Sequence, residues 1–321
     1  MKQLGAGHLL RGVALAALLS LGATTLAGCS NASTLHTTKG KISVVVSVNT
    51  WGGIAETVGG KYVSVTSLIS DWRQDPHGYQ ATVRDQLAVN QAKLVIANGQ
   101  GYDNFVNSLI PTKKSKLVTI AQEFPADVAN GNPHLWYSLA TDIKVTNLLA
   151  ERLAAIDSIH AKYFRSNAKE LVGALTRLQG KERTLASAVA GRSALAVESI
   201  ADYMLRDCGI RNATPTAFAL AVQNDTEIPP QALADAKALI TQRKVSFLLL
   251  SLQAISPTDR SLEALATKLV HGQQLSQLGM SELRPAKQTF ARWMEDNVTN
   301  LFMALQVPTP DITVTPAEGN Q

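Results

Sequence analysis

The sequence contains only two cysteines, Cys29 and Cys208, and it has no long run of Lys or Arg. Two cysteines do not provide a disulfide framework. Without a basic run the chain has no feature typical of a nucleic-acid surface, so nucleic acid is not an expected partner. The chain also lacks the His-Glu-x-x-His and Gly-x-Ser-x-Gly motifs and any other nucleophile frame, which disfavours an enzyme.

The composition is that of a globular protein with a sizeable core. The chain has 321 residues, of which 45% are hydrophobic. This length is enough for about two domains at 100–200 residues each. The formal net charge of +5 falls to +3 if Lys2 and Arg11 are removed with an N-terminal leader. That balance is mild and predicts no strongly charged partner.

The first 28 residues have the pattern of a signal peptide. Lys2 and Arg11 form a positive segment, and Gly12 to Leu21 is an apolar stretch too short to span a bilayer. The ending Leu26-Ala27-Gly28-Cys29 resembles a bacterial lipobox. This resemblance implies cleavage before Cys29, attachment of lipid to its sulfur, and an extracytoplasmic location at the cell membrane. The alternative is an ordinary secretory signal with a chance cysteine.

The residues after the lipobox predict a flexible tether. Residues 29–40 are rich in Ser, Thr and Asn, a composition typical of flexible linkers. If Cys29 carries lipid, Cys208 has no partner for a disulfide. We therefore expect Cys208 to be a small buried hydrophobic residue rather than a nucleophile.

The first half of the remaining chain alternates β-branched runs with helical patterns. Ile42 to Val48 is typical of a strand buried on both faces. The segment Asn49 to Gly53 is expected to turn the chain before a helix through Ala55 to Val58. Alternation at this spacing predicts a parallel α/β sheet. Further strands are expected at Tyr62 to Ile69, Lys93 to Ala97 and Lys116 to Ile120. Helices are expected at Ala81 to Val89 and from Gly101-Tyr102-Asp103 over Phe105 and Leu109.

A longer helical pattern separates the two halves. Apolar residues recur at helical steps from Phe164 to Val189, and no proline interrupts residues 159–190. A helix of about 26 residues would be roughly 39 Å long. It is either an ordinary bundle helix or a stiff spine between two lobes, and its mid-chain position favours the spine.

A second α/β pattern follows the long helix. Strands are expected at Ser193 to Val197, Val245 to Leu250 and Gln274 to Met280. Helices are expected at Ala201 to Cys208, from the opening Ile228-Pro229-Pro230 through Leu239, at Leu262 to Leu269 and at Phe290 to Leu305. The sequence thus predicts an α/β protein with two lobes, each a parallel-type sheet flanked by helices, joined by one long rigid helix. The expected divisions are 1–28 signal peptide, 29–40 tether, 41–158 N-terminal lobe, 159–190 linking helix, 191–307 C-terminal lobe and 308–321 disordered tail.

Two Pro-His loops are the clearest candidates for a binding site. They are Asp75-Pro76-His77 and Asn132-Pro133-His134. Proline fixes one backbone angle and restricts the residue before it, so each histidine is presented from a stiff loop. A stiff site loses less entropy when an ion binds, and neutral imidazole is a common ligand for transition metals. Taken singly, however, a histidine in a turn is usually a polar surface residue.

Two glutamates complete the candidate ligand set. Glu198 follows an apolar strand, where a carboxylate is costly unless it is paired or bound to a metal. Glu282 follows the last expected strand and, taken alone, is expected to be solvated. Ligands of open α/β sheets bind beyond the carboxyl ends of strands. A cleft between the lobes could therefore gather His77, His134, Glu198 and Glu282.

Five segments around the candidate ligands form a recognisable pattern. They are Asn49-Thr50-Trp51-Gly52, Asp75-Pro76-His77-Gly78-Tyr79, Ala97-Asn98-Gly99-Gln100-Gly101-Tyr102-Asp103, Asn132-Pro133-His134-Leu135-Trp136 and Ser281-Glu282-Leu283-Arg284-Pro285. Together they resemble the metal-binding solute-binding lipoproteins of bacterial ABC uptake systems for zinc and manganese (cluster A-I type). The resemblance implies two α/β lobes, one linking helix, an ion held between the lobes, and a monomer that delivers the ion to a membrane permease without an organic cofactor.

The resemblance also implies a role for each candidate ligand. His77 and His134 match the two histidines of the first lobe. Glu198 stands where members carry a third histidine or a glutamate, and Glu282 stands at or near a position that is usually aspartate. Gln80, in place of a common glutamate, and Ser251, in place of a common asparagine, depart from the pattern.

The ligand chemistry predicts Mn²⁺ or Zn²⁺. Two imidazoles are softer ligands than Mg²⁺ prefers, and carboxylates shift the set toward Mn²⁺, although Zn²⁺ binds more tightly in the general affinity series. Binding is expected to weaken as the pH falls through the histidine range, about 6.5. The alternatives are a lipid-anchored metalloenzyme, whose catalytic zinc would keep an open position, and a lipoprotein that binds a non-metal solute or partner.

Overall fold

The structure is a computed structural model that describes residues 40–110, 116–253, 255–268, 273–311 and 314. Residues 37–321 form one compact unit, to which every element below belongs. The predicted signal peptide, the lipidation site Cys29 and all of the predicted tether except Gly40 lie outside the described residues.

The first sheet consists of four parallel strands in the order β2-β1-β3-β4. β1 (Ile42–Val48) lies inside this sheet, and its alternate side chains are covered on both faces, as the β-branched run predicts. The other strands are β2 (Val63–Ile69), β3 (Leu94–Ala97) and β4 (Leu117–Thr119). All three lie within the segments where the sequence predicts strands.

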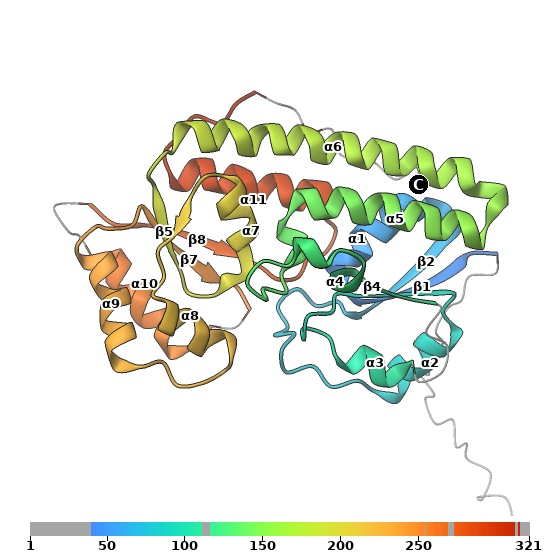
Figure 1. The fold of residues 1–321 in the computed structure, drawn as a ribbon, viewed down its shortest axis with the longest axis horizontal. Helices are drawn as coiled ribbons and strands as arrows, with labels where there is room; N and C mark the ends of the chain where they lie inside the picture. The colour runs from blue at the N-terminus through green and yellow to red at the C-terminus, as the bar shows by residue number, and fades with distance from the viewer. Residues whose placement is uncertain (1–39, 111–115, 254, 269–272, 312–313, 315–321) are drawn as a thin grey trace, which may run out of the picture. The chain divides into compact units, whose positions relative to one another are not determined.

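Helices cover both faces of this sheet. α1 (Asn49–Gly59) and α5 (Leu139–Ile156) lie on one side, and α2 (Val83–Gln91) and α3 (Phe105–Leu109) lie on the other (Figure 1). The short α4 (Ile120–Glu123) follows β4 directly.

The expected turn at Asn49 to Gly53 is wrong, because α1 begins at Asn49 itself. Gly52 and Gly53 inside α1 permit close packing instead. A Cβ atom on Gly53 would lie 2.8 Å from Nε of Arg284, and one on Gly52 would lie 2.9 Å from Oγ of Ser67.

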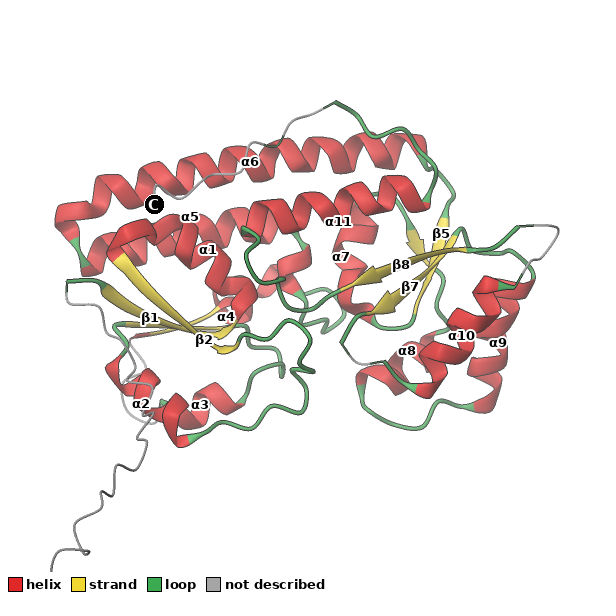
Figure 2. Ribbon diagram, turned by 180° about the vertical axis from the view of Figure 1, so that it is seen from behind, coloured by secondary structure: helices red, strands yellow, loops and turns green. Residues whose placement is uncertain are grey.

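The long helix is present as α6 (Ala161–Ala188), which has 28 residues. At 1.5 Å per residue it is about 42 Å long. It packs against α5 and α1 near its beginning and against α7 (Asp202–Asp207) and α11 (Phe290–Ala304) farther along (Figure 2). One helix therefore contacts elements of both halves of the chain.

The second sheet repeats the strand order of the first. Its parallel strands run β6-β5-β7-β8, with β5 (Ser193–Ala196), β6 (Arg211–Asn212), β7 (Phe247–Ser251) and β8 (Ser276–Met280). Helices α8 (Thr216–Gln223) and α9 (Pro230–Thr241) connect β6 to β7, and α10 (Pro257–Thr267) connects β7 to β8. This confirms the predicted α/β architecture of two parallel sheets flanked by helices with one long helix.

Three local features of the second half differ from the prediction. The two-residue strand β6 and the helix α8, which is apolar over most of its length, have no clear periodic pattern and were not predicted. α10 begins at Pro257 rather than Leu262, because Ser256 and Asp259 form a capping box at its first turn. In the tail, residues 308–311 and 314 are described, and Val314 is buried, contrary to the disorder expected for that residue.

Cys208 is buried, as the sequence predicts, and it is a free cysteine in the described part of the chain. Among the helices that the structure describes, none has the length and hydropathy required to cross a bilayer.

Candidate metal centre

Three of the four predicted ligands converge beyond the carboxyl ends of the strands. His77 lies in the loop between β2 and α2, His134 lies between β4 and α5, and Glu282 lies two residues after the end of β8. Loops beyond these strand ends are where open α/β sheets bind ligands. The two sheets thus contribute to one site, although the ligands are far apart in sequence.

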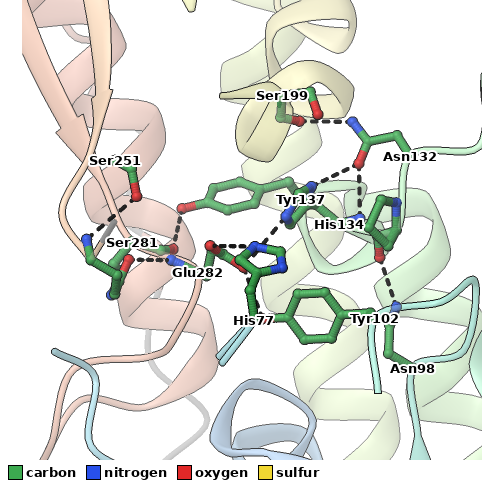
Figure 3. Close-up of polar contacts among 12 residues, drawn as sticks. His77, Asn98, Tyr102, Asn132, His134, Tyr137, Ser199, Ser251, Ser281 and Glu282 are labelled. Carbon is green, nitrogen blue, oxygen red and sulfur yellow. Dashed lines mark hydrogen bonds and ion pairs between the residues drawn. The ribbon is translucent and has the colours of Figure 1, made fainter. Parts of the chain in front are cut away.

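The ligand atoms of these three residues are close enough to share one ion (Figure 3). Nε2 of His77 lies 3.3 Å from Oε1 of Glu282, and Nε2 of His134 lies 3.4 Å from Oε2 of the same carboxyl group. One ligand atom from each residue can be chosen so that all three lie within 4.8 Å of one another. Two atoms bound to a tetrahedral zinc ion at about 2.1 Å are about 3.4 Å apart, so the observed spacing suits such an ion.

The burial of the three residues differs. Glu282 is fully buried, with 0% exposure, and His134 is 5% exposed, whereas the side chain of His77 is 52% exposed. The expectation that Glu282 would be solvated is therefore wrong. The pattern of the sequence around Glu282 could not reveal this burial, because side chains from the other half of the chain produce it.

The charges of the cluster are coupled. Burial opposes ionisation of Glu282, but the contacts with His134 and His77 outweigh it and hold the pKa of this carboxyl group well below its usual range. The contact with Glu282 raises the pKa of His77 to about 9 against the opposing effect of burial. Without an ion, the His77 imidazole therefore carries a proton at neutral pH and pairs with the Glu282 carboxylate.

Asn132 fixes the orientation of the His134 ring. Its Oδ1 atom lies 2.8 Å from Nδ1 of His134 and accepts a hydrogen bond of 2.9 Å from the backbone N–H of the same residue. An amide oxygen can only accept, so Nδ1 of His134 carries a proton, and in the neutral ring Nε2 then keeps its lone pair. That is the tautomer in which Nε2, the atom that faces Glu282, can bind a metal.

The residues around Glu282 were not predicted as part of the site. Tyr102 donates a hydrogen bond of 2.8 Å to Oε2 of Glu282, and Thr50 donates one of 3.0 Å to its backbone carbonyl. Oε1 of Gln253 accepts from the backbone N–H of Glu282 at 3.0 Å, and Nε2 of Gln253 donates to the carbonyl of Trp72. Thr50 and Tyr102 lie in segments of the family resemblance, but no spacing rule connects them to Glu282.

Nε2 of His134 and Oε1 of Glu282 are buried, and among the described residues neither atom has a hydrogen-bond partner beyond the His–Glu282 contacts of 3.4 and 3.3 Å. A cation among these atoms would interact with both lone pairs. The donor set of two imidazoles and a carboxylate fits a transition-metal ion better than Mg²⁺.

Glu198 does not belong to the group of three residues whose ligand atoms meet. It is partly buried, and its Oε2 atom has no hydrogen-bond partner in the described part of the chain. Burial, and next the charge of Glu282, raise the pKa of Glu198 to about 7. Glu198 is therefore near enough to be influenced by Glu282, and its role as a ligand stays a prediction.

The sequence profile of the family described as zinc-uptake complex component A, periplasmic, matches residues 44–304 of the chain. Among curated proteins, the manganese-binding lipoprotein MntA of Bacillus subtilis is 26% identical over 45% of this chain and 50% of its own length. The iron ABC transporter substrate-binding lipoprotein MtsA of Streptococcus pyogenes is 22% identical over 68% of this chain and 74% of its own length. For three of the curated relatives the match spans only about half of the relative's own length. The share is 50% and 53% for two MntA proteins and 59% for a putative metal-binding protein of Treponema pallidum.

Solved structures share the fold at low sequence identity. The periplasmic zinc-binding protein TroA from Treponema pallidum superposes with a TM-score of 0.69 at 18% identity, covering 83% of this chain and 99% of TroA. The Mn²⁺ complex of FpvC from Pseudomonas aeruginosa gives 0.67 at 18% identity, covering 83% and 98%. At this identity the likeness shows the fold alone.

Proposed function

The chain belongs to the zinc-uptake complex component A family, and we propose that it captures a divalent transition-metal ion between its two lobes and delivers the ion to an ABC permease in the membrane. The observation that carries this proposal is the convergence of His77, His134 and Glu282. In this proposal residues 41–158 and 191–307 are the lobes, residues 159–190 link them, and Glu198 completes the ligand set from the second lobe.

The proposed ion is Mn²⁺ or Zn²⁺. The carboxylates favour Mn²⁺ relative to an all-nitrogen site, whereas the general affinity series favours Zn²⁺. Relatives named for manganese, iron and zinc support a transition-metal site and leave this choice to experiment. The affinity for each ion and the ion that is transported can therefore differ.

The test is a titration of the metal-free protein with Mn²⁺ and with Zn²⁺ in competition with a chelator of known affinity. His134→Ala and Glu282→Ala should each weaken binding by at least about 100-fold, because they remove groups inside the ligand cluster. His160→Ala is a matched control, since the Nδ1 atom of His160 also contacts an oxygen acceptor, Asp157, at 2.6 Å, outside the cluster. A wild-type protein that binds neither ion would refute the proposal.

The two alternative functions, a metalloenzyme and a lipoprotein for a non-metal solute, make different predictions. A metalloenzyme with catalytic zinc would keep one coordination position open for water. Membership of an uptake family supports a carrier rather than such an enzyme. A lipoprotein for a non-metal solute would show no metal-dependent stabilisation. A metal carrier at an ion concentration of 100 times Kd should gain about 2.7 kcal/mol in free energy of unfolding, which thermal unfolding with and without the ion would measure.

Attachment to the membrane through Cys29 is also part of the proposal. The lipobox motif supports it, and so do the lipoprotein names of the Bacillus and Streptococcus relatives. The protein would act as an extracytoplasmic monomer tethered near its permease. Cys29→Ala should release the protein from the membrane fraction, and mass spectrometry of the wild type should find the lipid on residue 29. A wild-type protein without lipid would refute the anchor while leaving the metal site untouched.

A further inference from the structure

Asn49 occupies a position from which one side chain reaches two ligand loops. It directly follows β1, is the first residue of α1 and is 6% exposed. Nδ2 of Asn49 donates to the carbonyl of Ser70 at 3.1 Å, and Ser70 is the first residue after β2 on the way to His77. The same nitrogen donates to the carbonyl of Arg284 at 2.7 Å, two residues after Glu282.

The amide of Asn49 pairs with both backbone groups of Arg284. Besides the bond from Nδ2, Oδ1 of Asn49 accepts from the backbone N–H of Arg284 at 2.9 Å. Exchanging the amide oxygen and nitrogen would set a donor against this N–H and an acceptor against two carbonyls, so the network fixes the assignment. Both donors of the side chain and one lone pair of its oxygen are used.

Other contacts hold the same loop to the first half of the chain. Tyr137 donates to the carbonyl of Ser281 at 2.8 Å, and Thr50 bonds the carbonyl of Glu282. The Arg284 guanidinium donates to Oε2 of Glu56 at 2.8 Å. The loop that carries Glu282 follows a strand of the second sheet, but it is held by α1 and by Tyr137, which precedes α5.

We propose that Asn49 is a positioning residue for the metal site, which sets the distance between the loop of His77 and the loop of Glu282. This inference rests on the proposed function and adds a residue that touches no ligand atom itself. Because one amide bonds both loops, it holds the loop of Glu282 beside the loop of His77 before an ion arrives. These two ligand loops then form a preassembled part of the site.

The experiment compares Asn49→Asp with Asn167→Asp in the full chain. Asn49→Asp removes both donors and sets a carboxylate against two carbonyl oxygens. Asn167 is a matched control because it is also buried and its Nδ2 donates to a backbone carbonyl, that of Val58, at 3.2 Å. Among the described residues Asn167 has no hydrogen bond to either ligand loop. Zn²⁺ and Mn²⁺ affinities are measured by competition, and the visible absorption of the Co²⁺-loaded protein reports the ligand geometry.

Asn49→Asp should weaken metal binding by about tenfold, the lower end of the loss seen when partners that orient metal ligands are removed. It should also change the Co²⁺ absorption bands, whereas Asn167→Asp should keep the wild-type affinity and spectrum. If Asn49→Asp does not fold, Asn49→Ser, a smaller change without added charge, gives the same readout. Wild-type affinity and an unchanged Co²⁺ spectrum in the folded Asn49 variants would overturn the inference, while absence of metal binding by the wild type would overturn the proposed function as well.

Discussion

Nδ2 of Asn132 donates a hydrogen bond of 2.7 Å to the backbone carbonyl of Ser199. Asn132 orients the His134 ring through its other amide atom, and Ser199 directly follows Glu198. One side chain thus joins the loop of a histidine ligand in the first half to the loop of the proposed carboxylate ligand in the second half. Any separation of these two loops must break this bond.

The first prediction concerns Asn132→Ala. The change removes the acceptor that fixes the tautomer of His134 and the bond to Ser199, so metal affinity should fall by about 10- to 100-fold. Competition titration with Zn²⁺ measures it. Asp157→Ala is the control, because it removes the corresponding contact of His160 at 2.6 Å, outside the cluster. Equal affinities for both variants would contradict this role of Asn132.

The second prediction concerns protons released on metal binding. The contact with Glu282 raises the pKa of His77 to about 9, so below this pH the free site holds a proton that the metal must displace. Affinity should therefore rise by about tenfold per pH unit from 7 toward 9 and then level off. The sequence alone predicts a lower midpoint, near the ordinary value of an imidazole. Calorimetric titrations in buffers of different ionisation enthalpy count the protons, and release of none at pH 7 would contradict the prediction.

The third prediction tests whether Glu198 joins the metal shell. Its pKa of about 7 means that the carboxyl group is protonated in about half of the metal-free molecules at neutral pH. A carboxylate ligand must be ionised, so metal binding should release about half a proton from it, in addition to the proton from His77. In Glu198→Gln this half proton should disappear and affinity should drop by at least about tenfold. A variant with unchanged proton release and affinity would exclude Glu198 as a ligand.

The fourth prediction concerns the packing of α11 on α6. Nζ of Lys181 lies 2.7 Å from Oε1 of Glu295, and both side chains are buried. Lys181→Met leaves the Glu295 carboxylate with Arg292 at 3.8 Å as its remaining described ion-pair partner. The free energy of unfolding should fall by about 3 kcal/mol, as when one member of a buried pair is removed.

The control for this pair is the double variant Lys181→Met/Glu295→Leu, which leaves no buried charge. Its stability should return close to that of the wild type, because apolar replacements of a buried ion pair are often neutral. Chemical denaturation of the metal-free proteins measures both variants. If Lys181→Met is as stable as the wild type, the ion pair contributes little. Metal affinity should be unchanged in both the single and the double variant.

The amino-acid sequence by itself determined the architecture. β-branched runs such as Ile42 to Val48 bury both faces of a strand, and the apolar residues from Phe164 to Val189 recur at the helical period, so local patterns specify the alternation and the long helix. The Pro-His loops also identify His77 and His134, because proline restricts the backbone beside each histidine. Segments without a periodic pattern, such as β6 and α8, could not be found in this way.

Only the tertiary structure decided which side chains meet. Glu282 follows an ordinary strand in the sequence, and its full burial arises because Thr50, Tyr102 and the two imidazoles close over it from the other half of the chain. Gly52 and Gly53 read as a turn but lie inside α1, where glycine suits the close approach of Ser67 and Arg284, residues distant in sequence. Burial, pKa and ligand geometry depend on contacts between distant segments, and no local pattern encodes those contacts.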